Sequence, residues 1–293
     1  MYPLELIVPP GFLANEPVRT ALIVGAGAAV VSAIVGVFTV MRGQSFAGHA
    51  LADVSSAGGS AAFLLGLNPL LGFLGVAALA AGGMEWADVR DARERDLVTG
   101  VMLGVGLGLT ALLLYLGTIR GSTSGAAIAI LFGSMFTIPA SLIPLALTVA
   151  GVALVAIAAI YRPLLLSSLS ADLAQAQGAR VRRMGLVHAL ALALAVSLAA
   201  MTVGAILSTA LLIGPAAAAL RFADRPGRAL GWAVAIGWAA TWGGILLAYD
   251  SFYWTPGHGW PVSFFIVVLI FIGYLLAGLA GRRPARQGLE RPA

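Results

Sequence analysis

The sequence predicts an all-α membrane protein, a polytopic bundle of about 8–9 spanning helices. Of its 293 residues, 60% are hydrophobic and only 10% are charged, which is far from the composition of a soluble domain. The mean hydropathy is correspondingly high, at +0.98. Apolar runs of about 18 to 23 residues recur along the chain, and each is long enough to cross roughly 30 Å of hydrocarbon.

We expect these runs to form one transmembrane domain that extends over residues 1–293. Short breaks rich in Gly, Pro or charge separate the runs and place the turns between helices. Residues 125–136 are apolar but too few to span, so a re-entrant or interfacial piece is expected there. The count is about nine crossings, or eight if one run is re-entrant. The expected spans are residues 18–40, 45–67, 69–84, 97–118, 139–161, 184–202, 203–220, 229–249 and 262–280.

The arginines predict how the helices are oriented. With the N-terminus outside, 15 of the 17 arginines fall on the inner side, and only Arg19 and Arg120 fall outside. Cytoplasmic connections carry an excess of positive charge, so this distribution predicts an outer N-terminus and an inner C-terminus. The basic tail at residues 282–293 is expected to lie on the inner side, against anionic lipid headgroups.

The chain contains no Lys and no Cys. A Walker A loop needs a Lys that contacts the phosphates, so the chain is not expected to hydrolyse ATP itself. Without thiolates, any metal site must use nitrogen and oxygen ligands. No nucleophile with a partnered base is recognisable, so an enzyme is disfavoured, and no nucleic-acid partner is expected.

His49 and Asp53 stand four residues apart within the second expected span. Four residues make about one helical turn, so both side chains leave the same face of the helix. Ionisable side chains are costly inside a membrane and generally mark a substrate or ion pathway. An imidazole and a carboxylate together suit Zn²⁺, Mn²⁺ or Fe²⁺. The pair predicts a cation pathway; the alternative is a buried hydrogen-bonded couple that fixes helix packing.

The longest inner connection, residues 162–180, is expected to contain a short helix of about two turns. Ser170 is a good N-cap, Asp172 suits the first turn, and Gly178 suits the residue after the helix end. Such a helix is either a simple turn between spans or a docking element for a cytosolic partner.

Four stretches resemble the membrane subunits of bacterial zinc and manganese ABC importers, in the same order along the chain. Residues 41–53 are similar to an Arg-Arg-x-Ser-x-x-Gly-Asp-x-Leu-(Ser/Ala)-His segment, with one extra residue between Arg and Ser. Residues 170–178, Ser-Ala-Asp-Leu-Ala-Gln-Ala-Gln-Gly, resemble the coupling segment Ser-Pro-Asp-Leu-Ala-x-x-x-Gly. Residues 203–219 resemble the signature Val-Gly-Ala-Leu-Leu-x-x-Ala-Leu-Leu-Ile-x-Pro-Ala-Ala-x-Ala. Residues 252–261 resemble an external loop with the pattern Tyr-x-x-x-Pro-x-Gly-Pro.

This resemblance implies the membrane permease subunit of an importer for Zn, Mn or Fe ions, in the inner membrane of a bacterium. It implies alternating access driven by separate cytosolic ATPase subunits, an extracytoplasmic metal-binding protein that delivers the ion, and a permease dimer. The metal is expected as the substrate, with no permanently bound cofactor. The residues implied to couple the ATPase to the permease are Ser170, Asp172, Leu173, Ala174 and Gly178.

The family pattern places the carboxylate first and the imidazole one turn later, whereas here His49 precedes Asp53. The reversal keeps one nitrogen and one oxygen ligand on one helix face but moves the carboxylate by about 6 Å along the axis. Two other functions remain open. A permease for a metal chelate or a cobalamin-like cofactor would not need the pair to face the path. A proton-coupled secondary transporter would use the pair as a proton relay.

The outer end of the expected bundle carries two weaker candidates, Asp250 and His258. Asp250 is expected at a membrane boundary, where it could attract incoming cations. His258 lies in the external loop between two tryptophans, where it could contact the delivery protein. Both are candidate external contacts; the alternatives are a solvated helix end and an ordinary interfacial loop.

Two further features have structural explanations. His188 has apolar neighbours and is expected to be a packing residue rather than a ligand. Gly100, Gly104 and Gly108 recur at every fourth position, and such small residues are expected to let a neighbouring helix approach closely.

Overall fold

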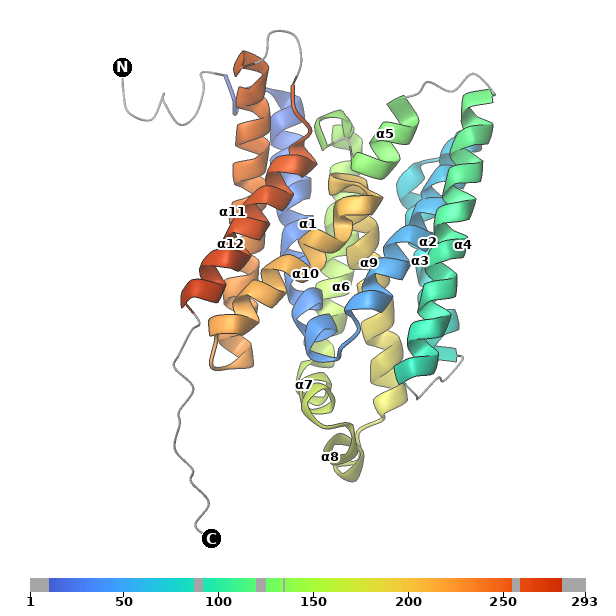
Figure 1. Ribbon diagram of the computed structural model, residues 1–293, viewed down its shortest axis with the longest axis vertical. Coiled ribbons are helices and arrows are strands. Elements are labelled where there is room, and N and C mark those ends of the chain that lie inside the picture. Colours follow the sequence, from blue (N-terminus) through green and yellow to red (C-terminus); the bar gives the residue numbers. More distant parts are fainter. Residues whose placement is uncertain (1–10, 87–91, 120–124, 134, 255–258, 281–293) are drawn as a thin grey trace.

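The computed structural model describes residues 11–86, 92–119, 125–133, 135–254 and 259–280. Within these residues the secondary structure is helical and contains no strand, which confirms the predicted all-α class (Figure 1). Each expected span corresponds to one long helix, with ends that differ by a few residues. The long helices are α1 (Glu16–Met41), α2 (Ser45–Leu64), α3 (Pro69–Trp86), α4 (Ala92–Ile119), α6 (Ile143–Ala159), α9 (Val181–Val203), α10 (Ala205–Phe222), α11 (Pro226–Trp254) and α12 (Val262–Ala280).

Eight helical segments in the described part are long and apolar enough to cross a membrane. The long helix α2 is not among them, because it carries His49, Asp53 and four serines within 20 residues. Polar side chains are tolerated at membrane depth where they face the protein interior or a pathway rather than lipid. α2 is therefore the long helix whose composition indicates function more than anchoring.

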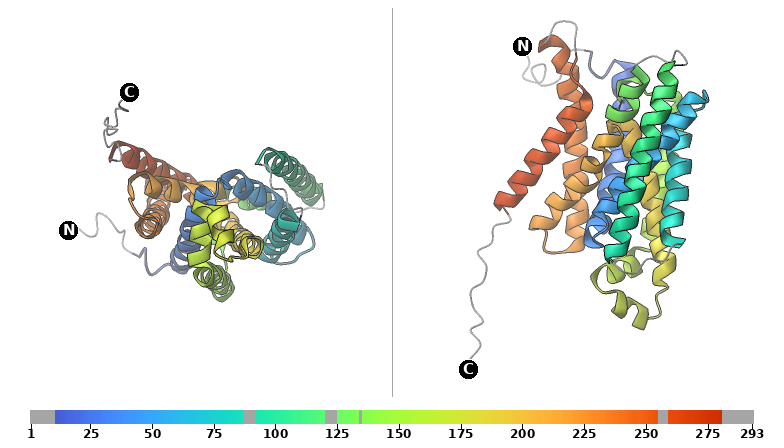
Figure 2. Two further views of the ribbon diagram at one scale, coloured as in Figure 1. Left: turned by 90° about the horizontal axis from the view of Figure 1, so that it is seen from below. Right: turned by 45° about the vertical axis from the view of Figure 1, so that its right-hand side comes forward.

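The bundle has a central layer and a periphery (Figure 2). Among the eight apolar segments, those of α1 and α9 are the most enclosed by other helices, with 72% and 67% of their residues buried. In the segment of α4 only 17% of the residues are buried. α2 and α10 cross these central helices obliquely, as Figure 1 shows. The largest cluster of buried apolar residues draws most of all on α1 and α9, with smaller contributions from α3, α6, α11 and α12.

The short helix α5 (Gly125–Phe132) confirms that the stretch at 125–136 does not span. Two 3₁₀ turns, η1 (Met135–Thr137) and η2 (Ala140–Leu142), lead from it into α6. The end of α5 touches the break between α9 and α10, where Gly133 and Gly204 both have positive φ. A methyl group on either residue would overlap the backbone of the other segment, so this contact requires glycine.

The connection between α6 and α9 contains two helices, α7 (Tyr161–Leu169) and α8 (Ala171–Ala176). The sequence analysis predicted α8 but did not predict α7. Pro163 occupies the first turn of α7, where backbone N–H groups have no partner within the helix and proline is tolerated. Figure 1 places α7 and α8 at the end of the bundle opposite α5, together with the α1–α2 and α10–α11 turns.

The expected role of Gly100, Gly104 and Gly108 was wrong. No atom of another element lies within 4 Å of the position that a Cβ would take on any of the three. Gly106 makes the close approach instead, and a Cβ there would lie 2.7 Å from the backbone nitrogen of Val54. The sequence does not show which face of α4 packs against α2, because Gly106 lies on a different face of α4 from Gly100, Gly104 and Gly108.

Candidate metal site

The turn between α1 and α2 sets the position of the candidate site. α1 ends in a Schellman motif: Gly43, with φ of 64°, donates its N–H to Val40, and Gln44 donates to Thr39, at N···O distances of 3.0 and 2.9 Å. α2 then begins directly at Ser45. This tight connection fixes the direction of α2 relative to α1 and places His49 in its second turn.

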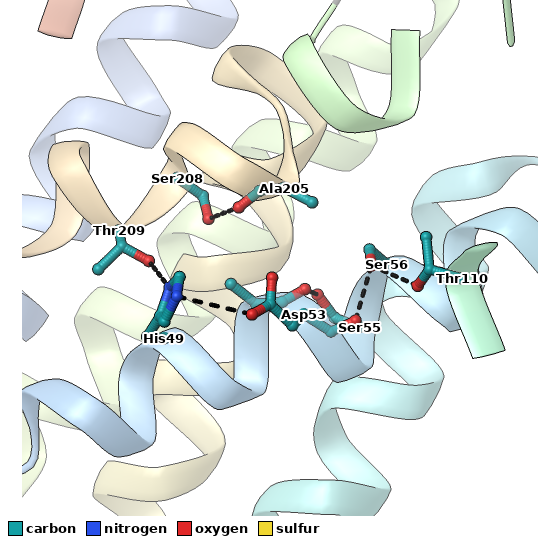
Figure 3. A network of polar contacts seen from close by, with 9 residues as sticks. His49, Asp53, Ser55, Ser56, Thr110, Ala205, Ser208 and Thr209 are labelled. Carbon is teal, nitrogen blue, oxygen red and sulfur yellow. Dashed lines mark hydrogen bonds and ion pairs between the residues drawn. The ribbon is translucent and has the colours of Figure 1, made fainter. Parts of the chain in front are cut away.

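His49 and Asp53 face each other along α2, as predicted from their spacing (Figure 3). Nε2 of His49 lies 3.6 Å from Oδ2 of Asp53. The imidazole is 38% exposed, whereas the carboxylate is only 3% exposed. Oδ2 of Asp53 is buried and has no hydrogen-bond partner within the described structure. A buried carboxylate oxygen without a donor is costly, and a bound cation would compensate that cost.

The hydroxyl of Thr209 on α10 contacts the other nitrogen of the imidazole, and the sequence analysis did not predict this contact. Nδ1 of His49 lies 2.8 Å from Oγ1 of Thr209 (Figure 3). A hydroxyl can donate or accept, so this contact is compatible with either neutral tautomer. When Nδ1–H donates to Thr209, the lone pair of Nε2 points at the space beside Asp53. This is the arrangement in which histidines bind metals, with the second nitrogen oriented by a hydrogen bond.

The gap between Nε2 and Oδ2 has the right size for a transition-metal ion. Such ions bind imidazole nitrogen and carboxylate oxygen at about 2.1–2.2 Å, so an ion bound to both atoms would make an N–metal–O angle of about 110–120°. That angle is close to tetrahedral. Among the described residues no three His, Cys, Asp or Glu side chains gather around one point.

The hydroxyl groups next to Asp53 bind the backbone and each other rather than the carboxylate. The hydroxyl of Ser56 lies 2.6 Å from the carbonyl oxygen of Asp53 and 2.7 Å from the hydroxyl of Thr110 on α4, which itself lies 2.8 Å from the carbonyl oxygen of Gly106. When one hydroxyl donates to its backbone carbonyl, the other can donate to that hydroxyl and link the two helices. These contacts hold α4 against α2 and leave the carboxylate oriented towards His49.

The short helix α8 has both of the predicted ends. The hydroxyl of Ser170 accepts a hydrogen bond from the N–H of Leu173 at 3.3 Å, as an N-cap does. Gly178 has φ of 78° and donates to Gln175, while Ala179 donates to Ala174, which completes a Schellman motif. Ala174 is fully buried, whereas the side chain of Leu173 is 50% exposed. An exposed Leu on a rigid helix is available for a partner.

Asp250 and His188 are not part of this site. Asp250 stands near the end of α11 that lies far from α8, and its neighbour Ser251 accepts a hydrogen bond from the N–H of Trp260 at 2.8 Å. His258 lies outside the described residues. His188 is buried on α9, as expected of a packing residue. Neither Asp250 nor His188 forms a contact with the His49–Asp53 pair within the described structure.

The chain is similar to known transport proteins over nearly its whole length. Residues 14–277 match the model of the ABC 3 transport family. The manganese transport system membrane protein MntC of Listeria innocua is 26% identical over 278 residues, which cover 95% of each chain. The high-affinity zinc uptake system membrane protein ZnuB of Haemophilus influenzae is 29% identical over 236 residues, which cover 79% of this chain and 88% of ZnuB. The solved structure of PsaBC from Streptococcus pneumoniae in complex with Fab aligns with a TM-score of 0.76 and 25% identity, over 91% of this chain and 92% of the PsaBC chain.

Proposed function

The chain belongs to the ABC 3 transport family, and on this basis we propose that it is the membrane permease subunit of an ATP-driven importer of divalent metal ions. Two similar proteins of nearly equal length are named for manganese transport and zinc uptake. These names favour a metal ion over a metal chelate or a cobalamin-like cofactor as the substrate. They also favour an ATP-driven permease over a proton-coupled secondary transporter.

The observation that carries the choice of substrate is the His49–Asp53 pair. One imidazole nitrogen and one carboxylate oxygen lie 3.6 Å apart, and that oxygen is buried without a hydrogen-bond partner in the described structure. Nitrogen and oxygen ligands suit Mn²⁺ and Zn²⁺, and they would also accept Fe²⁺. The names of the similar proteins narrow the proposed substrate to manganese or zinc.

Two protein ligands are too few to bind a metal ion tightly, which suits a site on a transport pathway. An ion that is transported must leave a site as readily as it enters, so tight binding would stop conduction. The partly exposed imidazole would meet the ion first, and the buried carboxylate would neutralise part of its charge. In a permease dimer, a second copy of the pair would supply two more ligands.

The ATPase is proposed to dock on α8. Its capped ends keep Ser170, Asp172 and Gly178 in fixed positions, and Leu173 offers an exposed apolar side chain beside the buried Ala174. A rigid helix transmits a displacement better than a flexible loop does. ATP hydrolysis by the partner would drive alternating access in this chain, which has no Lys for a P-loop of its own.

The orientation of the chain in the membrane follows from the same proposal. Docking of a cytosolic ATPase places α8, the α1–α2 turn and the α10–α11 turn on the cytoplasmic side, with the N-terminus outside and the C-terminus inside. The arginine distribution favours this orientation. The opposite end of α11, with Asp250, would then face the extracytoplasmic metal-binding protein, and His258 is proposed to lie near the same contact.

Metal uptake by cells that depend on this transporter tests the proposal. The double variant H49A/D53A should lose nearly all uptake of ⁵⁴Mn²⁺ or ⁶⁵Zn²⁺ while still assembling with its ATPase. The matched control is Ser55→Ala on the same helix, because Ser55 donates only to the backbone oxygen of Ala52 in the described structure. This control should transport normally. Uptake by the double variant at the wild-type rate would refute the role of the pair.

A further inference from the structure

We propose that Arg42 is a positioning residue that transmits movement of the α7–α8 unit to the His49–Asp53 pair. This inference rests on the proposed function, because it concerns how the ATPase acts on the proposed metal site. Arg42 belongs neither to the pair nor to α8. It stands at the turn between α1 and α2, and it contacts α7, the helix that leads into α8.

A hydrogen bond links Arg42 to α7, the helix that leads into α8. Nη1 of Arg42 donates a hydrogen bond to Oγ of Ser167, at 3.1 Å and across 125 positions of sequence. Ser167 lies on α7, three residues before the N-cap of α8. Its own hydroxyl donates to the carbonyl of Leu164 at 3.0 Å, which leaves a lone pair for the guanidinium. Leu164 is fully buried, so α7 is anchored in the core close to this contact.

The helix that leaves α8 packs against α1. α9 begins at Val181, a few residues after α8, and its buried apolar residues belong to the same core cluster as those of α1. α1 therefore adjoins the helix that leaves α8, while Arg42 at the end of α1 contacts the helix that leads into it.

The space around Arg42 allows such movement. A polar hollow of about 250 Å³ lies between the α1–α2 turn and the α7–α8 connection. Densely packed interiors move as rigid bodies, whereas polar contacts beside a hollow can shift and re-form. The residues that line the hollow are Met41, Arg42, Gln44 and residues 167–170.

The α1–α2 turn is tight enough to pass the displacement on to α2. Its Schellman motif leaves two residues, Gly43 and Gln44, between the cap at Arg42 and the start of α2 at Ser45. His49 lies only about 6 Å further along the axis of α2. A small tilt of α2 would change the single hydrogen bond from His49 to α10, and with it the geometry of the pair.

Two measurements on the complex of permease, ATPase and metal-binding protein test this inference. The first is the amount of Mn²⁺ or Zn²⁺ transported per ATP hydrolysed in proteoliposomes. The variants are Arg42→Ala, the conservative Arg42→Lys, Ser167→Ala, and Arg225→Ala as a matched control. Arg225 is an exposed arginine in the α10–α11 turn at the same end of the bundle.

The second measurement does not depend on the metal. The chain has no cysteine, so a single cysteine at the exposed Phe46 on α2 reports on the movement of that helix. The rate at which F46C reacts with a soluble thiol reagent is compared between ATP-bound and nucleotide-free complexes. A nucleotide-dependent rate shows that α2 responds to the ATPase, whichever ion is transported.

The inference predicts that R42A lowers transport per ATP at least tenfold while assembly and ATP hydrolysis continue. In R42A the nucleotide dependence of F46C labelling is lost, whereas R42K and R225A keep it. S167A acts in the same direction. The double variant R42A/S167A is no worse than R42A, because S167A removes only the hydrogen bond that R42A already removes. Normal coupling in R42A, or a loss of assembly that R42K does not restore, would overturn the inference. If the wild-type complex moves no metal but labelling still depends on nucleotide and Arg42, the proposed substrate is wrong and the inference stands.

Discussion

His49 on α2 and Thr209 on α10 are joined by a 2.8 Å contact between Nδ1 and Oγ1, across 160 positions of sequence. This contact orients the imidazole so that Nε2 faces Asp53, and it also ties together two helices that cross the bundle obliquely. The candidate metal site is therefore sensitive to how α2 and α10 lie relative to each other. Alternating access would act on the site through that relationship.

Removing the hydroxyl of Thr209 should weaken metal handling without removing a proposed ligand. Thr209→Val keeps the shape of the side chain but leaves His49 without its orienting partner. Loss of such a partner typically costs about 10–100-fold in metal affinity or activity, so we expect a drop in uptake at low metal concentration towards that range. Thr209→Ser keeps the hydroxyl and should behave nearly as wild type. Uptake kinetics of the two variants make the comparison, and equal loss in both would contradict this role.

Acidification should lower transport through the same imidazole. A proton on Nε2 occupies the lone pair that the metal needs, so binding a metal releases a proton and is opposed as pH falls. We therefore expect uptake to rise as the pH is raised. The check is the pH profile of initial uptake in wild type and in His49→Gln. A profile that is unchanged in His49→Gln would mean that another group sets it.

Leu173 should determine whether the ATPase binds. Its side chain is half exposed on a helix with both ends capped, so Leu173→Asp changes the surface of α8 without changing its core. We expect at least a tenfold loss of ATPase co-purification with the permease. Ser170→Ala removes only the N-cap, which is worth about 1 kcal/mol, and should weaken binding less. If the ATPase co-purifies normally with Leu173→Asp, the docking surface lies elsewhere.

Two glycines on α4 should differ in their effect on stability. A methyl group at Gly106 would lie 2.7 Å from the backbone nitrogen of Val54, so Gly106→Ala forces α4 away from α2. We expect it to destabilise the detergent-solubilised protein by about 1–3 kcal/mol. Gly104→Ala meets open space and should be neutral or stabilising by up to about 1 kcal/mol. Thermal unfolding of Gly106→Ala and Gly104→Ala tests this prediction, and equal melting temperatures of the two variants would contradict the packing described.

These sites show which parts of the molecule are encoded locally. The long helices follow from apolar length, and α8 follows from Ser170 and Gly178, because span length and helix capping are properties of neighbouring residues. The facing of His49 and Asp53 follows from a four-residue spacing. Each of these predictions uses residues less than about 25 positions apart.

The features that the sequence did not reveal depend on distant residues. Thr209 was part of a recognised stretch, yet nothing local indicated that its hydroxyl meets His49 from another helix. The choice of Gly106 over Gly104 depends on the rotation of α4 against α2. α7 was not predicted either, although Pro163 is compatible with it, because proline breaks a helix in its interior but not in its first turn.

The most direct test of the proposed metal site is whether a transported ion binds the imidazole of His49. Mn²⁺ is paramagnetic, so electron spin echo modulation detects the ¹⁴N nucleus of a bound imidazole. The measurement uses the permease–ATPase complex loaded with Mn²⁺ in the absence of the metal-binding protein. The chain has only two other histidines, and the H188F/H258A variant serves as the control. We predict nitrogen modulation in wild type and in the control, and its loss in His49→Ala. Bound Mn²⁺ without nitrogen modulation in wild type, or with modulation that persists in His49→Ala, would contradict the site.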